Sequence, residues 1–229
     1  TPFSGGSRVI QDGTFGARQV LIVSTVLYLV GAAIGVYLAV LRGWPVLWLG
    51  LIGVFLAFFH NAPPFRLYYR VPGLGELAVG LGFGPVTLLG AYYVQARQLD
   101  LGALWASLPV GLLIAAVLYI NEFPDYQADK AVGKKTLVVA FGREQAVWGY
   151  IALLVAAYLV IVSGVVLRFL PLTALLALLS VPLAYRSIQG ALRFHSDTPK
   201  LIPTNAMTIQ IHLLTGLLLC AAYIIARFL

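Results

Sequence analysis

Seven apolar stretches, each close to the length that crosses a lipid bilayer, follow one another along this chain. A membrane-crossing helix needs roughly 20 mainly apolar residues, because backbone polar groups in the hydrocarbon must find their partners inside the protein. The composition agrees, since 61% of the residues are hydrophobic and 10% are charged. We therefore predict an all-α fold, a polytopic transmembrane helix bundle, with helices over about 17–41, 44–60, 76–95, 103–121, 144–168, 171–187 and 205–227.

Two of these helices contain residues that often interrupt a helix. The third has several glycines around Pro85, and the sixth contains Pro182. Both features are tolerated in spanning helices that pack against neighbours, and small residues permit close helix contact. Because no repeat, linker or change of composition divides the chain, we predict one membrane domain over residues 1–229.

Positive charges are distributed unequally between alternate loops. One side carries eleven basic residues, namely Arg8, Arg18, Arg66, Arg70, Lys130, Lys134, Lys135, Arg143, Arg186, Arg193 and Lys200. The other side carries four, namely Arg42, Arg97, Arg168 and Arg227. Basic loops tend to stay cytoplasmic, so the first side is predicted to face the cytoplasm. The net charge of +7 then reflects topology, with anionic lipid headgroups or an anionic substrate as partners and no nucleic acid.

Acidic residues gather directly after the fourth apolar stretch. Asn121, Asp125 and Asp129 recur every four residues, a spacing that places three oxygen ligands on one helix face. Magnesium takes one or two carboxylates and fills its other positions with water or substrate phosphates. We therefore expect a metal site at Asp125 and Asp129. Pro124 should kink or restart the helix, which makes Asn121 the weaker member.

Basic residues surround this acidic stretch. Together they would clamp a diphosphate and stabilise the negative charge that develops as it departs. The members of this predicted set are Lys130, Lys134, Lys135, Arg143, Arg66, Arg70 and Arg8. Each cation taken singly is also explained as an orientation signal, and structural ion pairs would explain the mixed cluster. Both interpretations stay open on composition alone.

Other polar residues suggest structural roles. His60 and Asn61 end the second helix, where hydrogen bonding at a helix terminus accounts for them. Glu76 begins the third helix, where a carboxylate favours the positive end of the dipole. Four tyrosines near the charged side would contact a cationic group through their ring faces or form an interfacial belt: Tyr68, Tyr69, Tyr119 and Tyr126. The lone Cys220 excludes a disulfide framework and a cysteine-based metal site.

Residues 121–137, with the sequence NEFPDYQADKAVGKKTL, resemble the second aspartate-rich motif and following basic loop of the UbiA superfamily of intramembrane prenyltransferases. Three further stretches, 2–10, 73–77 and 91–95, resemble the branch that prenylates 1,4-dihydroxy-2-naphthoate on the way to menaquinone. The resemblance spans almost the whole chain.

This resemblance implies nine helices around a cavity and two aspartate motifs on the cytoplasmic side, which bind Mg²⁺ and a polyprenyl diphosphate. It gives Asp125 and Asp129 catalytic and metal-binding roles, and Asn121 and the basic set a diphosphate-binding role. It also implies a multi-pass protein of a prokaryotic cell membrane. Only about seven of the nine helices are predicted here, so we expect the first two helices and the first motif to be missing and this segment alone to be inactive.

Three alternatives remain. Within the family, the aromatic acceptor could be a benzoate, homogentisate, haem or chlorin. A transporter would also have many broken helices, but its ionisable groups typically lie near the bilayer midplane, whereas the acids here lie at the edge. A structural membrane subunit would show no dependence on a divalent metal. Acceptor identity, prenyl chain length and oligomeric state are not determined by the sequence.

Overall fold

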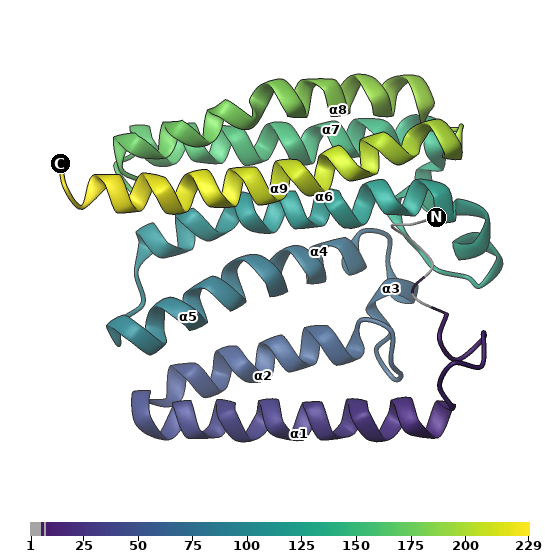
Figure 1. The fold of residues 1–229 in the computed structure, drawn as a ribbon, viewed down its shortest axis with the longest axis horizontal. Coiled ribbons are helices and arrows are strands. Elements are labelled where there is room, and N and C mark those ends of the chain that lie inside the picture. Colours follow the sequence, from purple (N-terminus) through teal and green to yellow (C-terminus); the bar gives the residue numbers. More distant parts are fainter. Residues whose placement is uncertain (1–5, 7) are drawn as a thin grey trace.

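The computed structural model describes residue 6 and residues 8–229, and all regular structure in this part of the chain is helical (Figure 1). The elements are α1 (Ala17–Arg42), α2 (Trp44–Phe59), the short α3 (Leu67–Arg70), α4 (Leu74–Leu81), the π-helical turn η1 (Gly82–Val86), α5 (Thr87–Ala96), α6 (Leu101–Ala131), α7 (Leu137–Val166), the 3₁₀ helix η2 (Leu172–Ser180), α8 (Val181–Phe194) and α9 (Thr198–Ala226).

Six helical segments of the described chain are long and apolar enough to cross a membrane, and α2 is a shorter apolar helix. The predicted third helix is α4, η1 and α5 in continuous succession, with Pro85 inside the π-helical turn. The predicted sixth helix is η2 followed by α8. The all-helical prediction is confirmed, and the protein is a multi-pass integral membrane protein.

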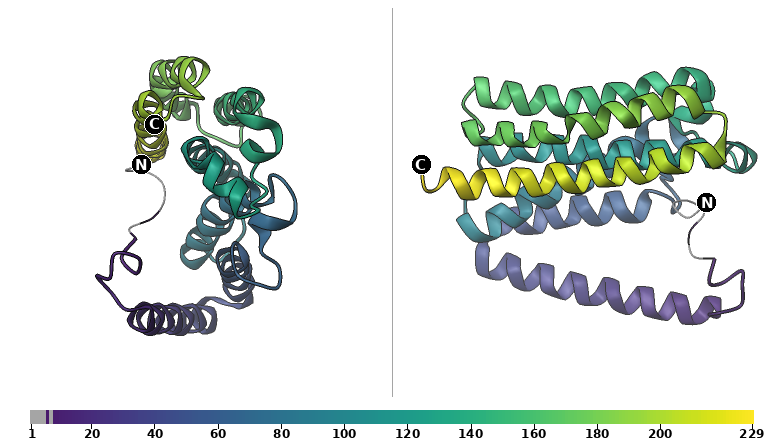
Figure 2. Two further views of the ribbon diagram at one scale, coloured as in Figure 1. Left: turned by 90° about the vertical axis from the view of Figure 1, so that its right-hand side faces the viewer. Right: turned by 45° about the horizontal axis from the view of Figure 1, so that its top comes forward.

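The long helices lie side by side along a common direction (Figure 1). Viewed end-on, they follow an open arc that starts at α1, passes through α2, α4, α5 and α6, and reaches α7, α8 and α9 (Figure 2). The end of α6 and the starts of α4, α7 and α9 meet at one end of the bundle, together with α3. The predicted acidic and basic site residues therefore fall at the same end of the molecule.

Three predicted helix boundaries on this side are wrong. The fourth helix continues beyond residue 121 to Ala131. A first helical segment of α7 begins at Leu137, but the non-helical backbone of Gly142 separates it from the long part of the helix, which agrees with the predicted start at 144. The sixth ends at Phe194 and the seventh begins at Thr198, so little loop remains between them. Apolar character ends at the membrane edge, but helical hydrogen bonding continues past it. The acidic cluster therefore lies on α6 and not in a loop.

Polar caps define where these extended helices begin. The Thr136 hydroxyl accepts a hydrogen bond from the Val139 backbone N–H at 3.0 Å, at the start of α7. The Asp197 carboxylate accepts one from the Lys200 backbone N–H at 3.3 Å, at the start of α9. Such side chains satisfy amides that a helix start leaves without partners.

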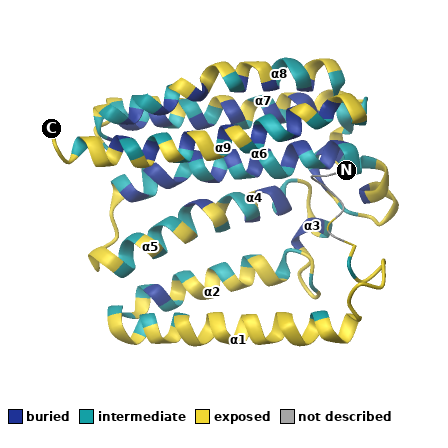
Figure 3. Ribbon diagram, in the orientation of Figure 1, coloured by how far each residue is buried: buried dark blue, intermediate teal, exposed yellow. Residues whose placement is uncertain are grey.

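Burial is concentrated in the middle and C-terminal part of the arc. The main core cluster includes Tyr119, Phe123, Tyr150 and Leu154, all at 1% exposure or less. By contrast, α1 contains no buried residue and is apolar along its length (Figure 3). The core thus forms where α6, α7 and α9 meet, and α6 is the helix around which the site is built.

Glycines let α6 approach the third spanning segment closely. A methyl group added at Gly84 of η1 would lie 2.6 Å from the Gly111 Cα of α6. One added at Gly111 would lie 2.5 Å from the Gly80 carbonyl oxygen. Contacts this short force backbone displacement, so side chains larger than hydrogen are excluded here.

We predict that Gly111→Ala destabilises the protein by ~1–3 kcal/mol through overpacking of α6 against α4 and η1. Gly90→Ala is the matched control, because nothing lies within 4 Å of the position of its added methyl group. Thermal unfolding of both variants in detergent measures the effect. Equal stability of the two variants would contradict the close packing.

Candidate functional site

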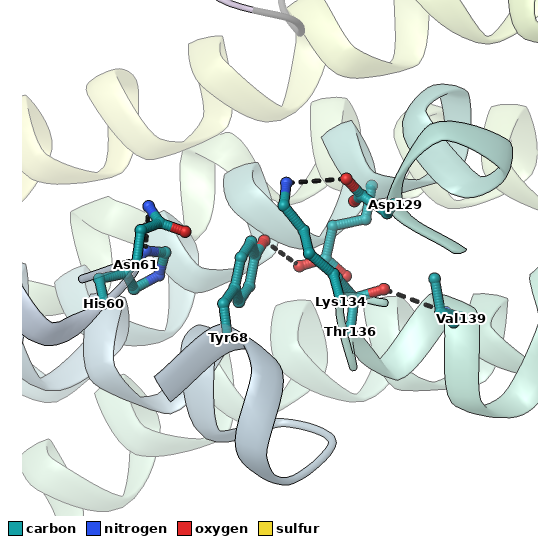
Figure 4. Close-up of polar contacts among 8 residues, drawn as sticks. His60, Asn61, Tyr68, Asp129, Lys134, Thr136 and Val139 are labelled. Atoms are coloured by element: carbon teal, nitrogen blue, oxygen red, sulfur yellow. Dashed lines mark hydrogen bonds and ion pairs between the residues drawn. The ribbon is translucent and has the colours of Figure 1, made fainter. Parts of the chain in front are cut away.

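Asp125 and Asp129 lie on the same face of α6, because the helix is continuous through both. Asp129 is 5% exposed and pairs with Lys134, whose Nζ lies 2.7 Å from Oδ1 (Figure 4). Asp125 is half-buried and has no hydrogen bond or ion pair within the described residues. One carboxylate is thus already neutralised by a cation, and the other is open to a ligand.

α6 continues through Pro124 as one helix, so the predicted restart of the helix at this residue is wrong. Proline lacks a backbone N–H, which leaves the carbonyl of Ile120, four residues earlier, without its helical donor. The Asn205 side chain of α9 supplies a donor instead, with Nδ2 at 3.2 Å from the Ile120 carbonyl oxygen. The buried carbonyl is therefore satisfied from a neighbouring helix, and α6 continues to the acidic residues.

The same Asn205 amide also holds Asn121. Its Nδ2 donates to Asn121 Oδ1 at 2.7 Å, and Asn205 is 1% exposed. Asn121 therefore lies at the contact between α6 and α9, and its oxygen is already engaged. The structure brings Asn121 near the aspartates along α6, as predicted, but gives it a packing partner that the sequence pattern did not indicate.

Tyr68 of α3 lies next to Lys134. The lysine Nζ is 5.1 Å from the centre of the Tyr68 ring, and the tyrosine hydroxyl donates to Glu122 Oε1 at 2.6 Å. Burial, together with the negative field of Glu122, raises the pKa of Tyr68 above its ordinary value. The phenol therefore stays protonated and acts as a hydrogen-bond donor (Figure 4).

His60 packs behind this tyrosine. The two ring centres are 4.5 Å apart, and Asn61 Nδ2 lies 3.2 Å from His60 Nδ1. Burial lowers the pKa of His60, and the nearby Lys134 charge lowers it further. A neutral, stacked histidine beside Asn61 agrees with the structural role predicted for both residues.

Two of the other predicted diphosphate ligands, Arg70 and Arg143, donate hydrogen bonds to backbone carbonyls of the protein. Arg70 donates to the carbonyls of Phe65 and Pro64 at 3.0 and 2.9 Å, and so braces its own loop. Arg143 donates to the Phe123 carbonyl at 2.9 Å and lies 5.2 Å from the Tyr126 ring. Some N–H donors of these two guanidinium groups are therefore already bonded within the protein.

Four further cations remain more exposed. Lys135 Nζ donates to the Arg70 carbonyl at 3.2 Å, and Lys130 lies 5.8 Å from the Tyr126 ring. Arg66 lies over Tyr69 at 5.3 Å, and Arg8 is exposed in the opening segment. Of the predicted basic set, Lys134 is the one that the structure pairs with an aspartate of the acidic stretch. Much of the resembling stretch 2–10 lies outside the described residues.

Sequence reasoning missed two kinds of residue. Asn205 was not among the predicted site residues, although an asparagine in an apolar helix is a usable signal for a buried hydrogen bond. Glu122 was counted in the acidic cluster without a role, and Glu76 was assigned to its own helix terminus. The structure places Glu76 in the first turn of α4, as predicted, and also shows its carboxylate accepting a hydrogen bond from the Leu137 backbone N–H of α7 at 2.8 Å.

The oxygen ligands at this end suit a magnesium ion only in part. Within the described residues, no group of three or more His, Cys, Asp or Glu side chains could hold a metal ion. Asp125 and Asp129 provide two carboxylates on one face, which is the number that Mg²⁺ commonly takes from a protein when phosphates complete its shell. The residues present therefore fit one arm of a metal–diphosphate site.

Residues 6–214 match the model of the UbiA prenyltransferase family. The chain belongs to this family. This match covers the apolar helices, the acidic part of α6 and the basic segment before α7, which are the features described above.

Several relatives are similar over most of the chain. A 2-carboxy-1,4-naphthoquinone phytyltransferase from Synechocystis sp. is 31% identical over 182 residues, which cover 80% of this chain and 59% of the relative. A 1,4-dihydroxy-2-naphthoate octaprenyltransferase from Bacillus subtilis is 25% identical over 97% of this chain and 70% of the relative. The enzyme of that name from Mycobacterium tuberculosis is 31% identical over 87% of this chain and 66% of its own length. The chain thus spans about three fifths of the length of the Synechocystis relative and about seven tenths of the length of the Bacillus subtilis relative.

We predict that Asn205→Leu destabilises the protein by ~1–3 kcal/mol, because it leaves the buried Ile120 carbonyl without a donor. The exposed Gln210 of the same helix provides the matched control, Gln210→Leu. Pro124→Ala should partly rescue the loss, because alanine restores the backbone N–H. Thermal unfolding of the single and double variants measures this coupling, and strictly additive effects would exclude it.

Proposed function

We propose that the complete protein transfers a polyprenyl group from a polyprenyl diphosphate to an aromatic acceptor, most specifically 1,4-dihydroxy-2-naphthoate, in a Mg²⁺-dependent reaction. The family match and the names of the similar naphthoate and naphthoquinone prenyltransferases support this proposal. The single structural observation that carries it is the acidic face of α6 with Lys134 beside it.

The charged end of the bundle suits a diphosphate. Asp125 and Asp129 would hold Mg²⁺, which supplies positive charge to the diphosphate oxygens when bound. Lys134 is within reach of the same carboxylate, so its ammonium group can turn from Asp129 toward a phosphate oxygen. Cations placed in this way stabilise negative charge on the leaving diphosphate more strongly as the allylic carbon–oxygen bond breaks.

The apolar part of the bundle suits the isoprenoid chain. A cavity of about 540 Å³ lies between α4, α6 and α7, and apolar residues such as Leu77, Leu112 and Leu153 line it. Apolar walls exclude water, which would otherwise capture the carbocation-like centre before the aromatic ring does. The polar end and the apolar helices thus divide the two halves of a prenyl diphosphate between them.

The position of the charges argues against a transporter. The acidic residues of α6 lie in its last turns, at the end of the bundle where α3 and the 132–136 segment meet. A carrier would typically place such groups near the bilayer midplane.

Other aromatic acceptors, including 4-hydroxybenzoate, are the second candidates for the acceptor substrate. We also propose that the charged end of the bundle faces the cytoplasm of a prokaryotic cell.

We predict that Asp125→Asn and Asp129→Asn each lower turnover of the complete protein by about a hundredfold or more, because each removes one charge from the metal-binding face. Asp197→Asn is the control, since it lies at the same end of the bundle and asparagine also caps helices well. Transfer of labelled prenyl groups measures turnover. Activity of both α6 variants at the level of this control would refute the site.

Lys134→Gln is expected to raise the KM for polyprenyl diphosphate by roughly tenfold, as the loss of one charge-assisted hydrogen bond implies. Lys200→Gln serves as the control, because Lys200 is exposed and its ion-pair partner among the described residues is Asp197. The measurement is steady-state kinetics at saturating acceptor. A KM equal to that of the control would remove Lys134 from the diphosphate site.

A further inference from the structure

Three of the predicted diphosphate ligands form a basic patch of their own, which we call the α3 patch: Arg66, Arg70 and Lys135. Arg66 precedes α3 and Arg70 ends it, so the two lie one helical turn apart. Lys135 joins them from the segment before α7, because its Nζ donates to the Arg70 carbonyl at 3.2 Å. Its backbone N–H also donates to the Tyr68 carbonyl at 2.9 Å. Two segments far apart in the sequence thus bring three cations together.

The α3 patch lies on the opposite side of the 134–136 segment from the aspartates. Residues 134–136 are not helical, and neighbouring side chains of extended backbone point to opposite sides. The Lys134 side chain turns to Asp129 and is 25% exposed (Figure 4). The Lys135 side chain turns to Arg70 instead and is exposed. The patch is therefore a surface separate from the proposed metal–diphosphate site.

The charges of the α3 patch have no acidic partner in the part of the chain that the structure describes, where both ion pairs involve other lysines. Arg70 donates through Nε and Nη2 to two carbonyls of its own loop, which fixes the guanidinium group and leaves the Nη1 donors for a ligand. Arg66 lies over the Tyr69 ring. Like charges held side by side repel one another, so an anion from outside would stabilise the patch.

Apolar side chains show where the patch stands relative to the bilayer. Phe65, directly before it, packs its ring against Phe59 and Phe55 of α2, with ring centres 4.8 and 5.3 Å away. Phe65 is 45% exposed, and Val71, directly after the patch, is 58% exposed. Exposed apolar side chains at the end of a spanning helix belong at the edge of the hydrocarbon, so the adjoining cations stand at the level of the lipid headgroups.

We propose that the α3 patch binds the phosphate of an anionic phospholipid headgroup. Guanidinium and ammonium donors suit phosphate oxygens, and the surrounding bilayer supplies this ligand at high local concentration. A zwitterionic headgroup has its own cation to balance its phosphate, so an anionic lipid gains more from the patch. A bound headgroup would also hold the loop before α7 against α3, because Lys135 already links them. The proposal does not depend on prenyl transfer.

Native mass spectrometry of the complete protein in detergent tests this binding without an activity assay. Phosphatidylglycerol and phosphatidylcholine with the same acyl chains are titrated separately. The wild-type protein should bind the first phosphatidylglycerol about tenfold more tightly than the first phosphatidylcholine. The double variant Arg66→Gln/Lys135→Gln should lose most of this preference. Arg70 is left unchanged, because it braces its own loop.

The matched control is Arg186→Gln/Arg193→Gln, which removes two exposed cations of α8 on the same predicted side of the membrane. This control should keep the preference, and so should the charge-retaining variant Arg66→Lys/Lys135→Arg, which separates loss of charge from loss of folding. Equal loss in both Gln double variants would reduce the effect to general surface charge and overturn the site.

Competition by Mg²⁺ and inorganic pyrophosphate distinguishes the two phosphate sources. Phosphatidylglycerol should stay bound to the wild-type protein when they are added, because the metal–diphosphate site lies on the other side of the 134–136 segment. Displacement of the lipid, or a wild-type protein with no preference for phosphatidylglycerol, would overturn the proposal. Neither result bears on prenyl transfer, so the proposed function stands or fails separately.

Discussion

The carbonyl oxygen of Ile120 is the point on which the arrangement of the charged end depends. Pro124 deprives it of a helical donor, and a buried carbonyl without a partner is unfavourable by ~1–3 kcal/mol. Asn205 of α9 meets that need at 3.2 Å and holds Asn121 with the same amide. Because the helix continues past the proline, Asp125 and Asp129 stay in register with the spanning part of α6.

A second set of contacts fixes what faces the aspartates. Tyr68 is bonded to Glu122 on one side and to the backbone of the 132–136 segment on the other. This arrangement places Lys134 between the Tyr68 ring and Asp129. A cation thus lies at one aspartate, and the other aspartate is open. In the proposed reaction, a metal–diphosphate complex would replace the internal ion pair without leaving a buried charge alone.

Much of this could be predicted from the sequence. Hydropathy located the seven helices, because the bilayer imposes a nearly fixed apolar length. The four-residue spacing placed the two aspartates on one face, and the motif over 121–137 led to the family. Hydropathy could not show that α6 continues to Ala131, because polar residues extend a helix beyond the membrane edge without changing its backbone.

The contacts between helices could not be predicted from the sequence, for a different reason. Asn205 and Asn121 are 84 positions apart, and no local pattern relates them. The continuation of α6 through Pro124 was not predicted, because the Asn205 amide that replaces the missing backbone donor lies on another helix. Glu76 was placed at its own helix terminus because a local rule exists for that role, whereas its bond to Leu137 depends on the packing of α4 against the start of α7.

We propose that this acidic helix face serves Mg²⁺-dependent prenyl transfer to a naphthoate. The most direct measurement follows a labelled polyprenyl diphosphate incubated with 1,4-dihydroxy-2-naphthoate or 4-hydroxybenzoate, using membranes that contain the complete protein, with Mg²⁺ or with excess chelator. We expect a prenylated naphthoate product that disappears with the chelator. Transfer to 4-hydroxybenzoate alone would contradict the acceptor, and no transfer to any aromatic acceptor would contradict the function.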